Sequence, residues 1–323
     1  MKLTSPPRTA ALAAAALALT TVAGFAAGKV RTRLARRRHP APGAMVGQSG
    51  SRLHYVQQGS GPDLILIHGA AVTLGDMQPL IDVLARDHRV TAFDRPGHGH
   101  SDPAPREASP ARQAEKIRAA VQALGLRRPV VVGHSLGGTV ALAYGALYPA
   151  ETAGVVALAP LAYPGWGLGH VSPALHAMPL LGPVLSHSLF ALTDPLLMRL
   201  APRVMFAPQA PTRSFRERMP TALASSPASM RADGADMIAA SRALTVRSER
   251  YEDYPVPVQI VVGDRDVVLK PARQALRLAR DLPAAGLTVL PGIGHMLHHF
   301  QPEAVGTALA AILASGAPVA QAA

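Results

Sequence analysis

Between Arg52 and Ala159, short runs of hydrophobic residues alternate with stretches in which hydrophobic residues recur at helical spacing. The runs rich in Val, Ile and Leu predict strands over Arg52–Gln57, Asp63–His68, Arg89–Phe93, Pro129–Gly133 and Ala153–Ala159. The stretches with helical spacing predict helices over Asp76–Arg86, Pro110–Leu124 and Leu136–Tyr148. Strands that alternate with helices are typical of a mostly parallel sheet with helices on both faces, so the pattern predicts an α/β fold.

The alternation stops between Pro160 and Asp253, where helical pieces are divided by prolines and no strand pattern is found. It then resumes with strands and helices over Val256–Gly263, Lys270–Asp281, Leu287–Leu290 and Pro302–Leu313. This predicts an α/β core made of residues 52–159 and 254–315, interrupted by a helical cap over residues 160–253. Insertions of this kind often cover an active site.

Near its N-terminus the chain has an apolar stretch, Thr9–Gly28, of twenty residues without a charge. At ~1.5 Å per residue, such a helix is long enough to cross a bilayer core of ~30 Å. The basic run Lys29–Arg38 follows at once and favours an uncleaved membrane anchor over residues 1–38, with the catalytic part in the cytoplasm. The alternative is export after cleavage of a signal, since small residues near Gly28 have cleavage-like spacing. The Pro- and Gly-rich segment His39–Gly47 predicts a linker over residues 39–51.

Composition narrows the classes of function. The 323 residues include no cysteine, which excludes a disulfide framework, a cysteine nucleophile and cysteine-ligated metals. The net charge of +12 is concentrated at the N-terminus, because residues 1–38 hold eight Lys and Arg and no acid. Removing these eight from the 32 basic residues leaves 24 against 20 Asp and Glu. We therefore expect no nucleic-acid partner and assign the basic excess to a membrane surface.

The segment Gly133-His134-Ser135-Leu136-Gly137 has the form G-x-S-x-G and joins a predicted strand to a predicted helix. Flanking glycines permit the sharp turn that exposes a serine hydroxyl at such a position. The backbone N–H of Leu136, at the positive end of the helix dipole, would then point toward a developing oxyanion. The segment predicts a nucleophile at Ser135, the alternative being an ordinary helix-capping serine.

A serine nucleophile needs a base and a group that orients the base, and the chain supplies both in the order Ser, Asp, His. One predicted strand ends in Gly263-Asp264-Arg265-Asp266, so either Asp264 or Asp266 can reach the rim of the site. A glycine-rich loop after the last predicted strand carries His295. His298 follows three residues later and is expected to lie behind the base.

Together these motifs resemble the α/β-hydrolase superfamily, specifically its capped, esterase-like branch. The resemblance extends from about Arg52 to Leu313. Besides the motifs above, it includes His68-Gly69 after one predicted strand and the segment Asp94–Ser101 (DRPGHGHS) after the next. Each motif alone is common, but their order and spacing together are specific to this superfamily.

By position, the resemblance implies that Asp266 is the catalytic acid and His295 the base. It also implies that the backbone N–H of Ala70 is the second oxyanion donor and that no cofactor is required. His68 and His134 are expected to support the site instead of transferring protons.

The thirteen histidines suggest a metal site as an alternative to the serine hydrolase site. His295, His298 and His299 can be combined with Asp264 or Asp266 as a ligand set. The chain has no H-E-x-x-H motif, however, and the hydrolase pattern accounts for the late histidines. We therefore expect no metal.

The activity that this pattern predicts is hydrolysis of a carboxylic ester through an acyl-enzyme on Ser135. Methionines and leucines in the predicted cap favour an apolar small-molecule substrate. Haloalkane dehalogenases and epoxide hydrolases share the cap but need an aspartate nucleophile, which Ser135 argues against. Carbon–carbon bond hydrolases, cofactor-free perhydrolases related to haloperoxidases, and acyltransferases are the alternatives within the superfamily. A non-enzymatic ligand-binding scaffold is the alternative outside it.

Overall fold

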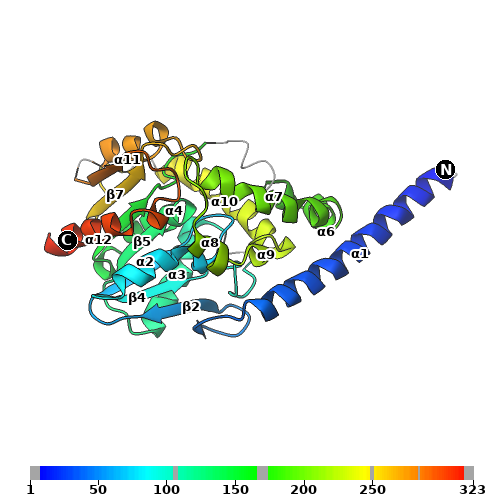
Figure 1. The fold of residues 1–323 in the computed structure, drawn as a ribbon, viewed down its shortest axis with the longest axis horizontal. Coiled ribbons are helices and arrows are strands. Elements are labelled where there is room, and N and C mark those ends of the chain that lie inside the picture. The colour runs from blue at the N-terminus through cyan, green and yellow to red at the C-terminus, as the bar shows by residue number, and fades with distance from the viewer. Residues whose placement is uncertain (1–7, 105–107, 166–173, 248–250, 283, 316–323) are drawn as a thin grey trace.

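The computed structural model describes residues 8–104, 108–165, 174–247, 251–282 and 284–315. Its centre is an eight-stranded sheet in the order β1-β2-β4-β3-β5-β6-β7-β8 (Figure 1). The strands are β1 (Ala44–Val46), β2 (Leu53–Gln58), β3 (Asp63–Ile67), β4 (Arg89–Phe93), β5 (Val130–His134), β6 (Gly154–Leu158), β7 (Val258–Gly263) and β8 (Gly286–Leu290). β2 pairs antiparallel with β1 and β4, and the other neighbours are parallel. The predicted α/β fold with a mostly parallel sheet is confirmed.

Helices cover both faces of the sheet (Figure 1). On one face, α3 (Pro110–Ala123), α4 (Leu136–Leu147) and α11 (Ala275–Asp281) pack against it in one apolar cluster. On the other face, α2 (Gln78–Leu84) and α12 (Pro302–Ala314) close a second cluster. Because β3, β5 and β6 lie between these layers, every residue in them is buried. This explains the unbroken hydrophobic runs of the sequence.

The segment predicted as a linker, residues 39–51, contains the edge strand β1. Ala44 pairs with Tyr55 of β2 in antiparallel register. Gly43 enters this strand at φ +82°, and a Cβ at Gly43 would overlap the carbonyl oxygen of Tyr55. Glycine is therefore required where the two backbones approach, and the composition that indicated a linker shapes the entry to a strand instead.

Between β6 and β7 the chain forms helices and, among the described residues, no strand. These helices, called the cap below, are α6 (Leu181–His187), α7 (Leu189–Met205), α8 (Arg213–Arg218), α9 (Thr221–Ala224) and α10 (Pro227–Arg247). In Figure 1 they gather on the side of the sheet from which α1 (Arg8–Arg38) projects. Residues 166–173 and 248–250 of the predicted insertion lie outside the described residues, as do residues 1–7 of the predicted N-terminal segment.

α1 is one continuous helix that includes both the apolar stretch and the basic run. Within the described part of the chain, it is the helix that is long and apolar enough to cross a membrane. Its N-terminal half extends away from the body (Figure 1). Its C-terminal half packs on the cap. The rings of Phe25 and His187 lie 5.0 Å apart, and the Arg31 guanidinium donates to the Ser225 carbonyl at 3.2 Å.

Candidate active site

Ser135 lies on the turn between β5 and α4, where strand changes to helix at a single residue. Its backbone has φ 53° and ψ −118°, a conformation that L-residues rarely adopt. The flanking glycines make this turn fit. A Cβ at Gly133 would overlap the carbonyl oxygen of Gly137, and a Cβ at Gly137 would overlap that of Ile67. A strained backbone at Ser135 and close packing around its flanking glycines are features of the sharp strand-to-helix turn known as a nucleophile elbow.

Asp266 and His295 form a buried pair. Oδ2 of Asp266 lies 2.7 Å from Nδ1 of His295, and both side chains are almost fully buried. The second carboxylate oxygen accepts the backbone N–H groups of Val268 at 2.8 Å and Leu269 at 2.9 Å. These bonds hold the carboxylate in one orientation. Since Nδ1 is engaged by Asp266, Nε2 is the nitrogen of His295 that can face a hydroxyl.

Asp264, the alternative acid, is exposed and bonded elsewhere. Its Oδ1 accepts the backbone N–H of Gly292 at 2.7 Å and closes the turn that leads into the loop of His295. The carboxylate that orients the imidazole is therefore that of Asp266, while Asp264 shapes the loop on which the imidazole is carried.

His134 connects the turn of Ser135 to the loop of His295. Its Nε2 lies 3.1 Å from the carbonyl oxygen of His295, and the two rings have centroids 4.7 Å apart. His134, which directly precedes Ser135, thus bonds to the backbone of His295. This contact places the two loops of the site side by side and agrees with a supporting part for His134.

The loop after β3 reaches the other side of Ser135. A Cβ at Gly69 would lie 3.3 Å from the Cβ of Ser135, tighter than ordinary contact. His68 holds this loop, because its Nδ1 lies 2.8 Å from the Gly69 carbonyl oxygen and its Nε2 accepts the N–H of Arg95 at 3.0 Å. Burial, together with the charge of Arg95, lowers the pKa of His68 to about 3, so it is neutral at pH 7. Ala70 follows and packs beside Leu136 in a small apolar cluster.

A further buried carboxylate, Asp76, contacts the segment that follows His295 and was not selected from the sequence. Its oxygens lie 2.8 Å from Nε2 of His299 and 3.1 Å from Nε2 of His298. Burial alone would raise the pKa of Asp76, but the charge and hydrogen bonds of these two histidines outweigh it and hold the pKa well below its usual range. The carboxylate ties the segment after Ala70 to the segment after His295.

Asp76, His298 and His299 also offer ligand atoms within 4.8 Å of one another, as a metal site would. This set differs from the one considered in the sequence, because Asp264 and Asp266 bond Gly292 and His295 instead. The distances inside the cluster are those of hydrogen bonds, which satisfy the carboxylate without an ion.

The cap meets the core at a buried group of charges around Arg95, which is fully buried. Its guanidinium donates to Asp236 on α10 and to Gln113 at 3.0 Å. His98 lies 2.9 Å from the same Asp236 carboxylate. Burial raises the pKa of Asp236 to about 6, against the opposing effect of Arg95. Burial likewise raises the pKa of Asp233, one turn earlier on α10, and the like charge of Asp236 adds to this effect, against the opposing charges of His98 and Arg95.

The same charges hold the loop that carries Ala70. Arg95 donates to the Gly69 carbonyl at 3.2 Å and to Asp233 at 3.4 Å. The second oxygen of Asp233 accepts the N–H of Ala71 at 3.0 Å. A helix of the cap therefore fixes the backbone on both sides of the expected oxyanion donor.

The connection between α7 and α8 in the cap also holds the loop of His295, through Gln209. Its amide nitrogen donates to the Gly292 carbonyl at 2.6 Å, and its amide oxygen accepts the N–H of Gly294 at 3.1 Å. Both loops that flank Ser135 are thus bonded to the cap. Sequence reasoning missed these contacts because the partners lie between 83 and 162 residues apart. One signal was present: Asp233 and Asp236 are three residues apart and so share a face of α10.

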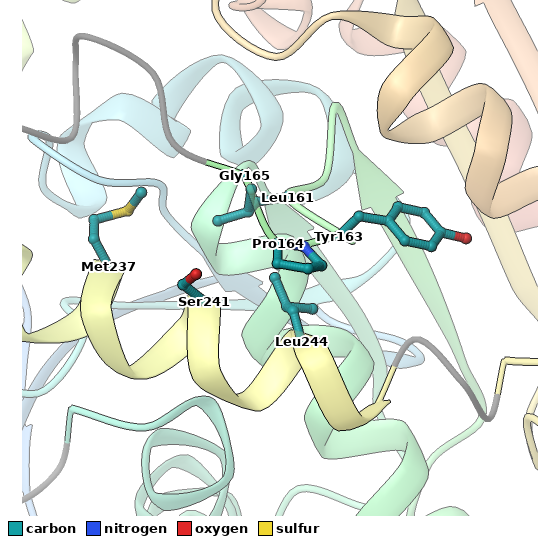
Figure 2. A pocket seen from close by; sticks show the side chains of 7 residues that line it. All are labelled: Leu161, Tyr163, Pro164, Gly165, Met237, Ser241 and Leu244. Carbon is teal, nitrogen blue, oxygen red and sulfur yellow. The ribbon is translucent and has the colours of Figure 1, made fainter.

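A pocket opens between α10 and the segment that follows β6 (Figure 2). The space in and above it, open solvent included, is about 250 Å³, and it is lined by Leu161, Tyr163, Pro164, Gly165, Met237, Ser241 and Leu244. In Figure 2, Met237, Ser241 and Leu244 rise from α10 toward this segment. Leu161 adjoins the nucleophile turn, because its N–H donates to the Ser135 carbonyl at 3.1 Å. The pocket is apolar and neighbours Ser135.

Similarity to known proteins extends over most of the chain. Residues 64–308 match the family model described as the Alpha/beta hydrolase family. An uncharacterized protein of Mycobacterium tuberculosis is 29% identical over 265 residues, which are 78% of this chain and 75% of that protein. The 2-(acetamidomethylene)succinate hydrolase of Mesorhizobium japonicum is 27% identical over 256 residues, 78% and 87% of the two chains. A thermophilic esterase from Thermogutta terrifontis has a similar fold, with a TM-score of 0.67 and 21% identity, covering 84% of this chain and 96% of that one.

Proposed function

Because the chain belongs to the alpha/beta hydrolase family and is an enzyme, we propose that it is a serine hydrolase that cleaves a carboxylic ester of an apolar small molecule. One observation carries the proposal: the strained turn of Ser135 adjoins the loop whose His295 is paired with Asp266. A serine, a histidine and a buried carboxylate in this order and arrangement are the parts that acyl transfer requires.

In the proposed reaction, Oγ of Ser135 attacks the ester carbonyl carbon while Nε2 of His295 accepts the hydroxyl proton. Asp266 stabilises the imidazolium that forms, and the N–H groups of Ala70 and Leu136 receive the oxyanion. Collapse of the tetrahedral intermediate breaks the ester C–O bond, and His295 gives its proton to the leaving alcohol. Water, deprotonated by His295, then attacks the acyl-enzyme, releases the acid and restores Ser135.

The apolar pocket beside Ser135 supports a substrate with a short apolar acyl group. The enclosed part of this pocket is far smaller than a site for a drug-sized ligand, so it fits a short group. Leu161, Met237 and Leu244 supply an apolar lining. Methionine adapts to ligands of varied shape, so a preference for chain length is expected to be broad.

We also propose that α1 stays attached as a membrane anchor, with the catalytic part in the cytoplasm. The packing of α1 on the cap, where Arg31 bonds the Ser225 carbonyl, supports retention of the helix, and the basic run Lys29–Arg38 supports the cytoplasmic side. Cleavage after the apolar stretch would remove the contact of Phe25 with His187. Mass spectrometry of the membrane fraction should find peptides from residues 9–38, whereas a mature N-terminus near Gly28 would support export.

The proposed activity is tested with p-nitrophenyl esters from acetate to long acyl chains, using the full chain and a Ser135→Ala control. We expect turnover with an optimum at short chains and a loss of about 10⁶-fold in kcat in the control. Turnover that persists in Ser135→Ala would contradict the serine mechanism. No turnover on any ester, with Ser135 still reactive toward a fluorophosphonate, would favour a carbon–carbon bond hydrolase or a narrow acyltransferase.

A further inference from the structure

The cap has an apolar face that the described part of the chain leaves exposed. Its members are Leu180, Leu181, Leu189, Leu196, Leu200 and Val204, each at least 45% exposed. On α7, the last four recur at i, i+7, i+11 and i+15, so they form one stripe along the helix. Soluble proteins seldom expose a continuous apolar patch unless it binds something.

The opposite side of α7 is apolar as well. Met198 and Pro202 lie there and are buried in the cap. These two side chains show that this side of α7 already has an apolar neighbour in the cap, whereas the exposed stripe has none among the described residues. The packing of the cap accounts for one side of α7, so the exposed stripe calls for a second apolar environment.

The charged side chains around this face indicate what kind of surface it can bind. Within residues 174–205 the only acidic side chain is Asp194, which is 1% exposed. Arg199 and Arg203 are exposed and border the stripe. Leucines flanked by arginines, without an exposed acid, are typical of helices that lie in the headgroup region of an anionic bilayer.

If α1 crosses a bilayer, its contact with α6 determines how deep the exposed apolar face lies relative to that bilayer. The backbone of α1 comes so close to α6 at Gly24 that a Cβ there would overlap the carbonyl of His187, and a Cβ at Gly28 would lie 3.3 Å from Pro227. The part of the apolar stretch that extends beyond this contact, residues 9–23, is about 22 Å long. A helix that crosses a bilayer core of ~30 Å must be roughly 8 Å longer than these residues. Within the apolar stretch, residues 24–28 supply that length. The segment of α6 beside them must then lie at the same depth.

From these observations, and given the proposed anchoring by α1, we propose that the exposed face of α6 and α7 lies in the headgroup region of the bilayer that α1 enters. The ~8 Å of α1 that the cap flanks agrees with the ~5–10 Å by which interfacial helices enter a membrane. The cap is then held on the lipid surface by its own leucines.

The absence of cysteine from the chain allows a direct test. Single cysteines replace Leu196 on α7, Leu12 in the N-terminal half of α1, and Leu313, which is 39% exposed on α12. Each full-length variant is labelled with an environment-sensitive nitrobenzoxadiazole dye and reconstituted in vesicles of phosphatidylcholine and phosphatidylglycerol. A nitroxide-bearing lipid then reports contact with the bilayer by quenching. Leu200→Cys gives a second position on the same stripe.

We expect blue-shifted emission and nitroxide quenching at Leu196→Cys, Leu200→Cys and Leu12→Cys, and neither at Leu313→Cys. Water-like emission at both α7 positions, with Leu12→Cys in lipid, would overturn the cap proposal and leave the anchor intact. Water-like emission at Leu12→Cys as well would show that α1 is not a membrane anchor, and the cap proposal would fall with it. Shielding at α7 without quenching, rising with protein concentration, would assign the face to a second copy of the chain and overturn the proposal.

Discussion

Asp264 and Asp266 are two positions apart, yet their surroundings differ in every respect that matters for catalysis. Asp266 is buried, bonded to His295 and fixed by two backbone N–H groups, whereas Asp264 is exposed and bonds a loop amide. A carboxylate can select the tautomer of an imidazole only if it lies beside Nδ1. The difference therefore assigns the two aspartates to different tasks in the proposed mechanism.

Replacing Asp266 by Asn should lower kcat by about 10⁴-fold, because an amide that donates to Nδ1 favours the wrong tautomer of His295. The matched control is Asp264→Asn, whose amide oxygen can still accept the N–H of Gly292. It should keep nearly all of the wild-type kcat. Steady-state hydrolysis of the best p-nitrophenyl ester measures both values. Equal losses in the two variants would contradict the assignment.

The raised pKa of Asp236 predicts a dependence of stability on pH. Folding raises this pKa from its usual value to about 6, so the folded state binds the proton more tightly. The contribution therefore favours folding below pH 4 and is lost as the pH rises through about 6. Asp236 faces Arg95 and His98. Burial lowers the pKa of His98 to about 4, so His98 is neutral only above that pH, where Asp236 titrates.

Urea unfolding at several pH values tests this prediction. Between pH 4 and 7, the unfolding free energy of the wild type should fall relative to that of Asp236→Asn. The surface variant Asp82→Asn should follow the wild type. A difference between wild type and Asp236→Asn that does not change with pH would refute the raised pKa.

Single residues also mark the limit of what the sequence could predict. Ser135, Asp266 and His295 stand in short motifs with glycines at fixed positions, so their proximity could be expected from local pattern and chain order. Asp76 stands in no such motif, and it meets His298 only because two loops that are 222 residues apart fold together. Partners of that kind are set by tertiary packing, which periodicity does not encode.

At the scale of helices and strands, the link between cap and core depends on α10. Asp233 and Asp236 face Arg95 inside the protein, and Arg95 in turn bonds the carbonyl of Gly69. Taking three charges out of water is costly unless each is paired, so the cluster is stable only when complete. The position of the cap and the shape of the Ala70 loop are therefore coupled through one guanidinium.

Replacing Arg95 by Met should destabilise the fold by about 3–5 kcal/mol, since two buried acids lose their partner. The control is Arg112→Met, which removes a surface pair with Glu115 and should cost at most about 1 kcal/mol. Urea unfolding measures both changes. Adding Asp236→Asn to Arg95→Met should recover part of the loss, because it removes one unpaired charge. A loss as small as that of the control would show that the cluster does not hold the cap.

Elements were easier to predict than their ends. The interior strands β3, β5 and β6 are hydrophobic throughout and were expected where they lie, because both of their faces are covered. The edge strand β1 was taken for a linker, since an edge strand needs few hydrophobic residues and its entry uses glycine. Likewise α11 begins at Ala275, five residues after the predicted start, because Pro271–Arg273 forms a separate helical turn.

In the whole molecule, the cap contacts both the loops of the candidate site and the helix α1. It bonds the loops of Ala70 and His295 through Asp233 and Gln209, and it packs on α1 through His187 and Ser225. The proposed membrane contact and the proposed active site are therefore connected by the same set of helices. In this account, the core supplies the reactive groups, while the cap sets the substrate and the distance from the lipid.

The central claim is that Ser135 is a nucleophile activated by His295, and covalent labelling tests it most directly. The full-length protein is treated with a fluorophosphonate, and the modified peptide is located by mass spectrometry. The account predicts one adduct, on Ser135, that is absent in Ser135→Ala and strongly slowed in His295→Gln. No adduct on the wild type, or an adduct that survives Ser135→Ala, would contradict it.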